Sequence, residues 1–182
     1  MELWDIYDEN KKPTGRTMKR NDWCLKDGEY HLTVLGVVGR PDGTFLITKR
    51  VMTKAWAPGW WEVSGGAAQA GEESCEAVLR EVKEETGLTL TSYQFRGLIT
   101  FISDVCEPEL MCLFTADGFT GSLTACNEGE LKWVDKSIVP SLPTWTGDAI
   151  FLKLLLEDEQ RFFTLRLVYE GDELVEHRLE FY

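Results

Sequence analysis

The segment 66–88 contains a group of acidic residues that could bind a metal ion. On a helix, with about 100° between successive residues, Glu81, Glu84 and Glu85 fall within one arc of roughly 100°. Three carboxylates on one helix face repel one another, so a cation is expected among them. Carboxylate oxygens without histidine or cysteine suit Mg²⁺ or Mn²⁺. The spacing therefore predicts a divalent-metal site on this face, with at least one carboxyl pKa raised by the repulsion.

The elements that must position these carboxylates can also be predicted. A helix over 72–86 would place the apolar residues Val78 and Val82 beside the acidic arc, so that one face packs and the other stays polar. Gly87 is suited to end that helix. The glycine pair 65–66, just before it, allows a tight turn and a close approach of the backbone to a metal or phosphate. The expected unit is a glycine turn followed by a two-faced helix.

The same segment satisfies the pattern G-x5-E-x7-R-E-U-x-E-E-x-G-U in full, where U is an aliphatic residue. A chance match to all of its fixed and aliphatic positions at a given start is on the order of 10⁻⁹. On this pattern the chain resembles the Nudix family, and 66–88 is its Nudix box. The resemblance implies a mixed sheet between helices and an enzyme that uses Mg²⁺ or Mn²⁺ to cleave a nucleoside diphosphate linked to another moiety.

The resemblance also implies roles for particular residues. Glu81, Glu84 and Glu85 would bind the metal, together with the backbone carbonyl of Gly66. Glu84 and Glu85 would act in catalysis with Glu128, an acid that follows the box. These residues form the expected catalytic and metal site.

The general base is left open among Glu84, Glu128 and Glu130, because all three are acids in suitable parts of the sequence. In the family, the residues that correspond to Glu72 and Arg80 support the loop and the helix. We therefore expect these two residues to be structural rather than to do chemistry.

The stretches 7–15, 46–50 and 58–62 look like the branch of Nudix proteins related to isopentenyl-diphosphate isomerase. This branch implies that Arg50 and Lys54 bind the diphosphate of the substrate. A guanidinium group suits phosphate geometry. An isomerase is therefore an alternative to a hydrolase.

The isomerases carry a catalytic cysteine and a histidine just before the acidic helix. At the corresponding places this sequence has Gly65 and Ala67, so hydrolysis is favoured. A third possibility is a non-catalytic protein that binds a nucleotide and uses the helix only to hold a metal. Markers of particular substrates are missing outside the box, and the substrate stays open.

Composition limits the partners. The 182 residues fit one domain over 1–182, and a formal net charge of −12 argues against binding a nucleic-acid duplex, which needs a basic surface. A phosphorylated small molecule remains compatible, because a bound divalent cation reverses the local sign. The amino end lacks the basic start and apolar run of a signal peptide, and no apolar stretch is long enough for a membrane helix. We expect a cytoplasmic protein without a membrane partner.

Runs of β-branched and aromatic residues between turn signals predict strands. The range 1–30 is expected to form an amino-terminal β-arm and 160–182 a carboxyl-terminal hairpin, while 31–38 and 44–48 are interpreted as another hairpin. A second helix is expected over 148–159. Strands and helices interleave irregularly, which indicates a mixed sheet with helices packed on it. Together with the Nudix resemblance, which implies a sheet between helices, this makes the predicted fold class α+β, an α/β/α sandwich. The arm and the terminal hairpin are expected to pair with a second copy in a homodimer.

Overall fold

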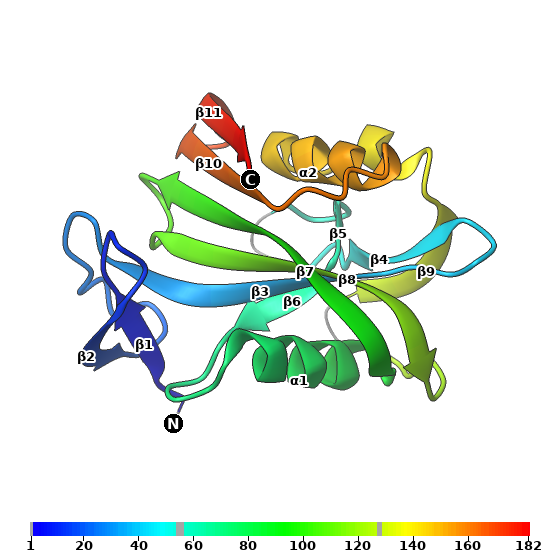
Figure 1. The fold of residues 1–182 in the computed structure, drawn as a ribbon, viewed down its shortest axis with the longest axis horizontal. Helices are drawn as coiled ribbons and strands as arrows, with labels where there is room; N and C mark the ends of the chain where they lie inside the picture. The colour runs from blue at the N-terminus through cyan, green and yellow to red at the C-terminus, as the bar shows by residue number, and fades with distance from the viewer. Residues whose placement is uncertain (1, 54–56, 127–128) are drawn as a thin grey trace.

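The computed structural model of the protein describes residues 2–53, 57–126 and 129–182. In this part of the chain, the larger of two β-sheets lies between two α-helices (Figure 1). One helix, α1, spans Ser74–Thr86, and the other, α2, spans Thr146–Leu156. They cover opposite faces of the sheet, so the predicted fold class is confirmed.

The strands of the larger sheet are β1 (Trp4–Tyr7), β2 (Pro13–Met18), β3 (Tyr30–Val38), β6 (Ser64–Ala67), β7 (Thr89–Ser103), β8 (Glu109–Thr120), β10 (Phe163–Glu170) and β11 (Glu173–Phe181). Their order is β11-β10-β7-β8-β3-β1-β2, with β6 beside β3. The sheet is mixed, because β3 runs parallel to β8 and β7 parallel to β10. The smaller sheet contains β4 (Thr44–Arg50), β5 (Trp61–Glu62) and β9 (Gly129–Asp135), in the order β5-β4-β9. A 3₁₀ turn over Val139–Ser141 precedes α2.

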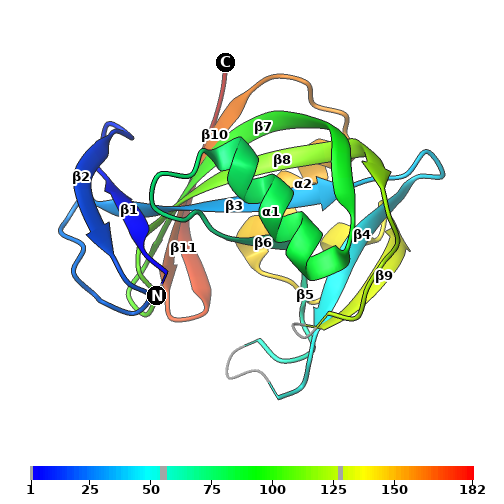
Figure 2. The same cartoon turned by 90° about the horizontal axis from the view of Figure 1, so that it is seen from below.

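Strand β3 is apolar on both faces, and this gives the sheet a core on each side. Val34 is buried in one cluster with Val82 of α1, whereas Val37 is buried in a second cluster with Phe151 of α2. Alternate residues of a strand point to opposite faces, so these two valines face different helices. Figure 2 shows α1 lying across β3, β7 and β8 from below.

Helix α1 begins later than the predicted 72–86. Glu73 is its N-cap and forms a capping box with Glu76, in which each side chain accepts a hydrogen bond from the other's backbone N–H. Gly87 ends the helix in the left-handed conformation, with φ 82°, and donates its N–H to the carbonyl of Lys83. Glu72 therefore lies in the loop before the helix.

The hairpin predicted over 31–38 and 44–48 is wrong. Its two strands lie in different sheets, and a single bridge between Gly39 and Phe45 joins their ends among the described residues. Consecutive residues of β4 are buried in the two different cores, so this strand is covered on both faces. It leaves β3 after the turn and pairs with β5 and β9 instead.

The two ends of the chain fold as expected. The arm strands β1 and β2 pair antiparallel, and so do β10 and β11 of the terminal hairpin. The second helix starts two residues before the predicted 148–159 and ends before its last turn. Within the described ranges, no helix has the length and apolar character needed to cross a membrane.

Gly36 of β3 sets how closely α1 packs on the sheet. A Cβ atom at this position would lie 2.7 Å from a methyl carbon of Val82 and 3.1 Å from one of Val78. We expect Gly36→Ala to lower the free energy of unfolding by about 1–3 kcal/mol, the usual cost of overpacking a core. Urea denaturation followed by tryptophan fluorescence measures the loss. Gly39→Ala is the control, since its Cβ would meet Phe45 at 3.5 Å, and an equal loss in both variants would contradict the packing limit.

The amino-terminal arm packs on the sheet through a pair of stacked rings. The indole of Trp4 lies 4.7 Å from the imidazole of His31, with 17° between the ring planes. The pKa of His31 is lowered to about 4, mainly by burial and also by the charge of Arg20. The carboxylate of Glu109 is 3.9 Å from Nε2, but burial raises its own pKa to about 7, so it carries less charge in the acid range. His31 is therefore neutral in the folded protein near neutral pH.

We expect His31 to contribute a loss of folded-state stability in acid. Between pH 6.5 and about 4 the unfolded chain binds a proton at His31 that the folded protein does not, so the contribution of His31 to the free energy of unfolding falls as pH is lowered through this window. The raised pKa of Glu109 acts in the opposite direction, so the contribution of His31 is measured as a difference between wild type and a variant. His31→Phe keeps a ring against Trp4 and cannot be protonated, so we expect the free energy of unfolding of wild type to fall relative to that of the variant as pH is lowered from 6.5 to 4. Urea denaturation at pH 4 to 7 compares the two proteins. Identical slopes would show that His31 is not the group responsible.

Candidate active site

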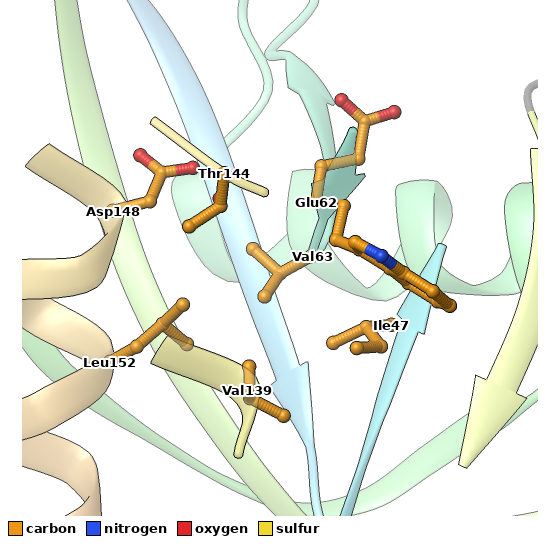
Figure 3. Close-up of a pocket in the computed structure, with 8 residues that line it drawn as sticks. Ile47, Glu62, Val63, Val139, Thr144, Asp148 and Leu152 are labelled. Atoms are coloured by element: carbon orange, nitrogen blue, oxygen red, sulfur yellow. The ribbon is translucent and has the colours of Figure 1, made fainter. Parts of the chain in front are cut away.

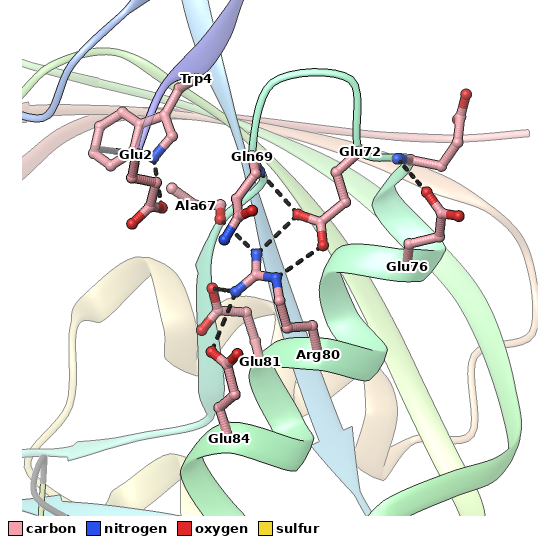
Figure 4. Close-up of polar contacts among 10 residues, drawn as sticks. Glu2, Trp4, Ala67, Gln69, Glu72, Glu76, Arg80, Glu81 and Glu84 are labelled. Carbon is pink, nitrogen blue, oxygen red and sulfur yellow. Dashed lines mark hydrogen bonds and ion pairs between the residues drawn. The ribbon is translucent and has the colours of Figure 1, made fainter.

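Arg80 is the centre of the polar contacts on the acidic face of α1 (Figure 4). Its Nε and Nη2 atoms each donate to one carboxylate oxygen of Glu72, both at 2.8 Å. Nη1 donates to Glu81 at 2.7 Å and to Glu84 at 3.4 Å, while Nη2 also donates to the carbonyl of Ala67 at 3.1 Å. One guanidinium thus joins the end of β6, the loop before α1 and two acids of the helix. The contact with Glu72 fits the predicted supporting role, whereas the contacts with the other two acids were not predicted.

Glu81 lies directly against the glycine pair. A Cβ atom on Gly66 would come within 2.5 Å of the Cδ atom of Glu81, so the carboxylate occupies the space that a side chain would need. A Cβ atom on Gly65 would lie 2.2 Å from the carbonyl oxygen of Val34 on the neighbouring strand. Close approach was the predicted reason for these glycines, and the groups that approach are a helix carboxylate and a strand backbone.

Glu85 lies beside the same turn, where it accepts a hydrogen bond from the backbone N–H of Gly65 at 3.3 Å. The pKa of Glu85 is raised to about 8, mainly by burial and to a smaller extent by the negative charges of Glu81 and Glu62. Burial also raises the pKa of Glu81, although Arg80 opposes the shift. The predicted direction is therefore correct, but burial contributes more than the repulsion from which it was predicted.

Glu84 is the outermost of the three helix acids, with 63% of its side chain exposed. Among the described residues, no three carboxylate, imidazole or thiolate side chains converge closely enough to hold a metal ion. The physical reason is that Arg80 holds Glu81, while Glu85 lies against the glycine turn and Glu84 faces solvent. The donors are carboxylate oxygens on one helix face, a set whose chemistry fits Mg²⁺ or Mn²⁺.

Arg50 ends β4, and its guanidinium donates to the carboxylate of Glu62 on β5 at 2.7 Å. The guanidinium is buried, with 8% of the side chain exposed. The charge of Glu62 acts on Glu85, which places this ion pair near the acidic face. Sequence reasoning missed Glu62, although it ends the stretch 58–62 that carried the resemblance. Its position just before the glycine turn was the available signal.

Two of the predicted site residues, Lys54 and Glu128, lie outside the described residues. The third candidate for the general base, Glu130, is on β9 and is 64% exposed. Its carboxylate lies 3.2 Å from the ammonium group of Lys132. Glu130 is therefore accessible, and its role stays a prediction.

A small pocket lies between α2 and the smaller sheet (Figure 3). Its volume is about 10 Å³, room for one water molecule. The carboxyl groups of Glu62 and Asp148 lie at one end, and Val139 lies at the other. The pKa of Asp148 is raised to about 7, mainly by burial and also by the charges of Glu62 and Glu109. No sequence signal marked Asp148 as a site residue, because an acid in the first turn of a helix is common for dipole reasons alone. The pocket is lined by Ile47, Trp61, Glu62, Val63, Val139, Thr144, Asp148 and Leu152.

Gly66→Ala tests whether the position of Glu81 matters for metal binding. The new methyl group would displace the Glu81 carboxylate, which is the far end of a flexible side chain, so the fold should persist. We expect Mn²⁺ to bind about 10- to 100-fold more weakly, as when a metal ligand loses its support. Isothermal titration calorimetry with Mn²⁺ measures the change. Gly39→Ala is the control, and equal Mn²⁺ affinity in all three proteins would rule out a role for this contact.

Comparison with known proteins agrees with the geometry. A family model described as "NUDIX domain" matches residues 29–155. The chain is 31% identical over 127 residues to "Uncharacterized Nudix hydrolase YvcI" of Bacillus subtilis, covering 67% of this chain and 80% of that protein. It is 31% identical over 151 residues to "Oxidized purine nucleoside triphosphate hydrolase" of Danio rerio, covering 82% and 94%.

Two further comparisons concern the fold and the isomerase branch. The crystal structure of a mutator MutT protein from Bacillus halodurans superposes with a TM-score of 0.73 at 28% identity, covering 82% of this chain and 97% of that one. An isopentenyl-diphosphate Delta-isomerase of Clavibacter sepedonicus is 33% identical over 149 residues, 78% of each chain. The isomerase branch noted in the sequence is therefore among the relatives.

Proposed function

This chain belongs to the Nudix family and is a hydrolase of that family, and we propose what it cleaves. The substrate is a nucleoside diphosphate joined to another moiety. The enzyme cleaves its diphosphate linkage and uses Mg²⁺ or Mn²⁺ as the metal. The observation that carries the proposal is the acidic face of α1. Glu81 and Glu85 there lie beside a glycine turn, whose backbone N–H already binds Glu85, and Glu84 is on the same helix face. Hard oxygen donors in this setting suit a small divalent ion that binds phosphate.

We assign the metal to Glu81, Glu84 and Glu85, with the carbonyl of Gly66. When bound, the ion polarises phosphoryl oxygens and activates a water molecule. Arg80 offsets the charge of Glu81 and Glu84, and its bonds to Glu72 would keep the loop in place if Glu81 bound the ion.

The base that takes a proton from the attacking water is Glu84, Glu128 or Glu130. Glu84 is the favoured candidate within the described residues, because it is exposed and on the same helix face as the proposed ligands. Arg50 and Lys54 would bind the phosphate groups of the substrate. The position of Arg50 beside Glu62, close to the acidic face, supports this assignment.

The surroundings of positions 65 and 67 disfavour the isomerase alternative. A cysteine at position 65 would place its Cβ atom 2.2 Å from the carbonyl oxygen of Val34, so this strand pairing leaves no room for a nucleophile there. Ala67, at the position of the isomerase histidine, is buried under the amino-terminal arm. Hydrolysis is the function that these two positions favour.

A second candidate substrate is an oxidised purine nucleoside triphosphate, the class named for the Danio rerio relative. The pocket beside Glu62 favours it. Asp148, with its pKa near 7, can donate a hydrogen bond when protonated and accept one when ionised, and the edge of a purine offers both kinds of partner. Because the pocket holds about one water, a base would contact its mouth rather than fill it.

The proposal also includes a cytoplasmic location and a homodimer. A negatively charged hydrolase of small phosphorylated molecules fits the cytoplasm. The sheet ends in β2 on one side and β11 on the other, so each offers a free edge to a second copy. We place the homodimer contact at one of these edges.

Glu85→Gln tests the function. Nucleoside diphosphate sugars, dinucleotides, and normal and oxidised purine nucleoside triphosphates are incubated with Mg²⁺ or Mn²⁺, and products are separated by anion exchange. We expect wild-type turnover of at least one of them and a loss of about 100-fold or more in the variant, because a metal supplies several kcal/mol of transition-state stabilisation. Glu76→Gln is the matched control, since glutamine preserves the capping box on the same helix.

The results separate the candidates. Turnover of the sugar nucleotides or dinucleotides supports the first substrate class, and turnover of the triphosphates alone supports the second. Full activity with EDTA, or in Glu85→Gln, would contradict the metal-dependent mechanism.

A further inference from the structure

The amino-terminal arm contacts the loop that leads into α1. The carboxylate of Asp5 on β1 accepts a hydrogen bond from the backbone N–H of Gly71 at 2.7 Å, although the two residues are far apart in the chain. The carbonyl of Leu3 accepts one from the N–H of Ala70, also at 2.7 Å. The arm therefore fixes two successive residues at the tip of this loop.

The arm also packs against the start of the loop. Trp4, Ile6 and Met18 are buried in one cluster with Ala67, the last residue of β6. The carbonyl of Ala67 accepts a hydrogen bond from Arg80. The arm thus holds the loop at two places, through an apolar contact at its start and hydrogen bonds at its tip.

The held loop bears directly on the acidic face. Gly71, in the left-handed conformation with φ 82°, is followed by Glu72, and both carboxylate oxygens of Glu72 bind Arg80. Arg80 in turn holds Glu81. A continuous series of contacts therefore runs from Asp5 to a proposed metal ligand.

We propose that the amino-terminal arm is a positioning element of the active site and that Asp5 is its positioning residue, acting on Glu81 through Gly71, Glu72 and Arg80. Asp5 itself contacts neither metal nor substrate. Without the hydrogen bond from Gly71 to Asp5, the tip of the loop is no longer fixed at this point. Glu72 then no longer holds Arg80 in one position. This inference rests on the proposed metal site, and it adds a role for a part of the chain outside the Nudix box.

Mn²⁺ titration of the full chain tests this role without any substrate. We expect Asp5→Ala to bind Mn²⁺ about fivefold more weakly than wild type, which corresponds to about 1 kcal/mol, the net value of one hydrogen bond. Asp5→Asn keeps an oxygen that can accept from Gly71 and should restore wild-type affinity. Isothermal titration calorimetry well below the melting temperature gives the dissociation constants.

Asp8→Ala is the matched control. Asp8 accepts hydrogen bonds from the N–H groups of Asn10 and Lys12 within the turn of the arm, so its loss loosens the arm without touching the loop. It should lower the melting temperature and leave Mn²⁺ affinity unchanged. Equal affinity in Asp5→Ala and wild type, or equal weakening in Asp5→Ala and Asp8→Ala, would overturn the proposal.

Glu85→Gln in the same titration separates this inference from the proposed function. If Glu85→Gln weakens Mn²⁺ binding and Asp5→Ala does not, the metal site stands and the positioning role falls. If Glu85→Gln binds Mn²⁺ as wild type does, or wild type binds none, the metal site itself is wrong and the role of Asp5 falls with it.

Discussion

The candidate site depends on one guanidinium, that of Arg80, which binds groups from a strand end, a loop and a helix at once. Its bidentate contact with Glu72 is partly buried, with 22% and 15% of the two side chains exposed. Hydrogen bonds to charged groups contribute about 1.5–3 kcal/mol each, more than a neutral pair. Without Arg80, the acids of α1 would face one another with no cation among them. The residue is thus a structural support that also conditions the charge of the site.

A second constraint is steric, and it brings the helix close enough for these contacts to form. Gly36 lets α1 approach β3, Gly65 lets β6 approach the same strand, and Gly66 leaves room for the Glu81 carboxylate. Each position excludes a side chain for a different reason: a valine methyl, a carbonyl oxygen and a carboxylate. The acidic face and the glycine turn are therefore one unit, and neither keeps its geometry without the other.

The sequence predicted what depends on local periodicity. The acidic arc of α1, its apolar face and the glycine at its end follow from spacing and residue type, whereas the sandwich of sheet and helices was implied by the Nudix resemblance. Contacts that depend on chain topology were not predictable: β4 was assigned to the wrong partner, and the pocket acids Glu62 and Asp148 come together from distant segments. The burial of Glu85 is of the same kind, because a helix pattern shows which residues share a face but not how deeply that face is covered.

The most direct test of this account is to locate Mn²⁺ by anomalous scattering in crystals of the protein soaked with MnCl₂. We expect an anomalous-scattering peak about 2 Å from carboxylate oxygens of Glu81 and Glu85 and near the Gly66 carbonyl. Arg80 should still be bound to Glu72. A peak elsewhere, or an acidic face of α1 without Mn²⁺ at saturating concentration, would contradict the assignment of this face as the metal site.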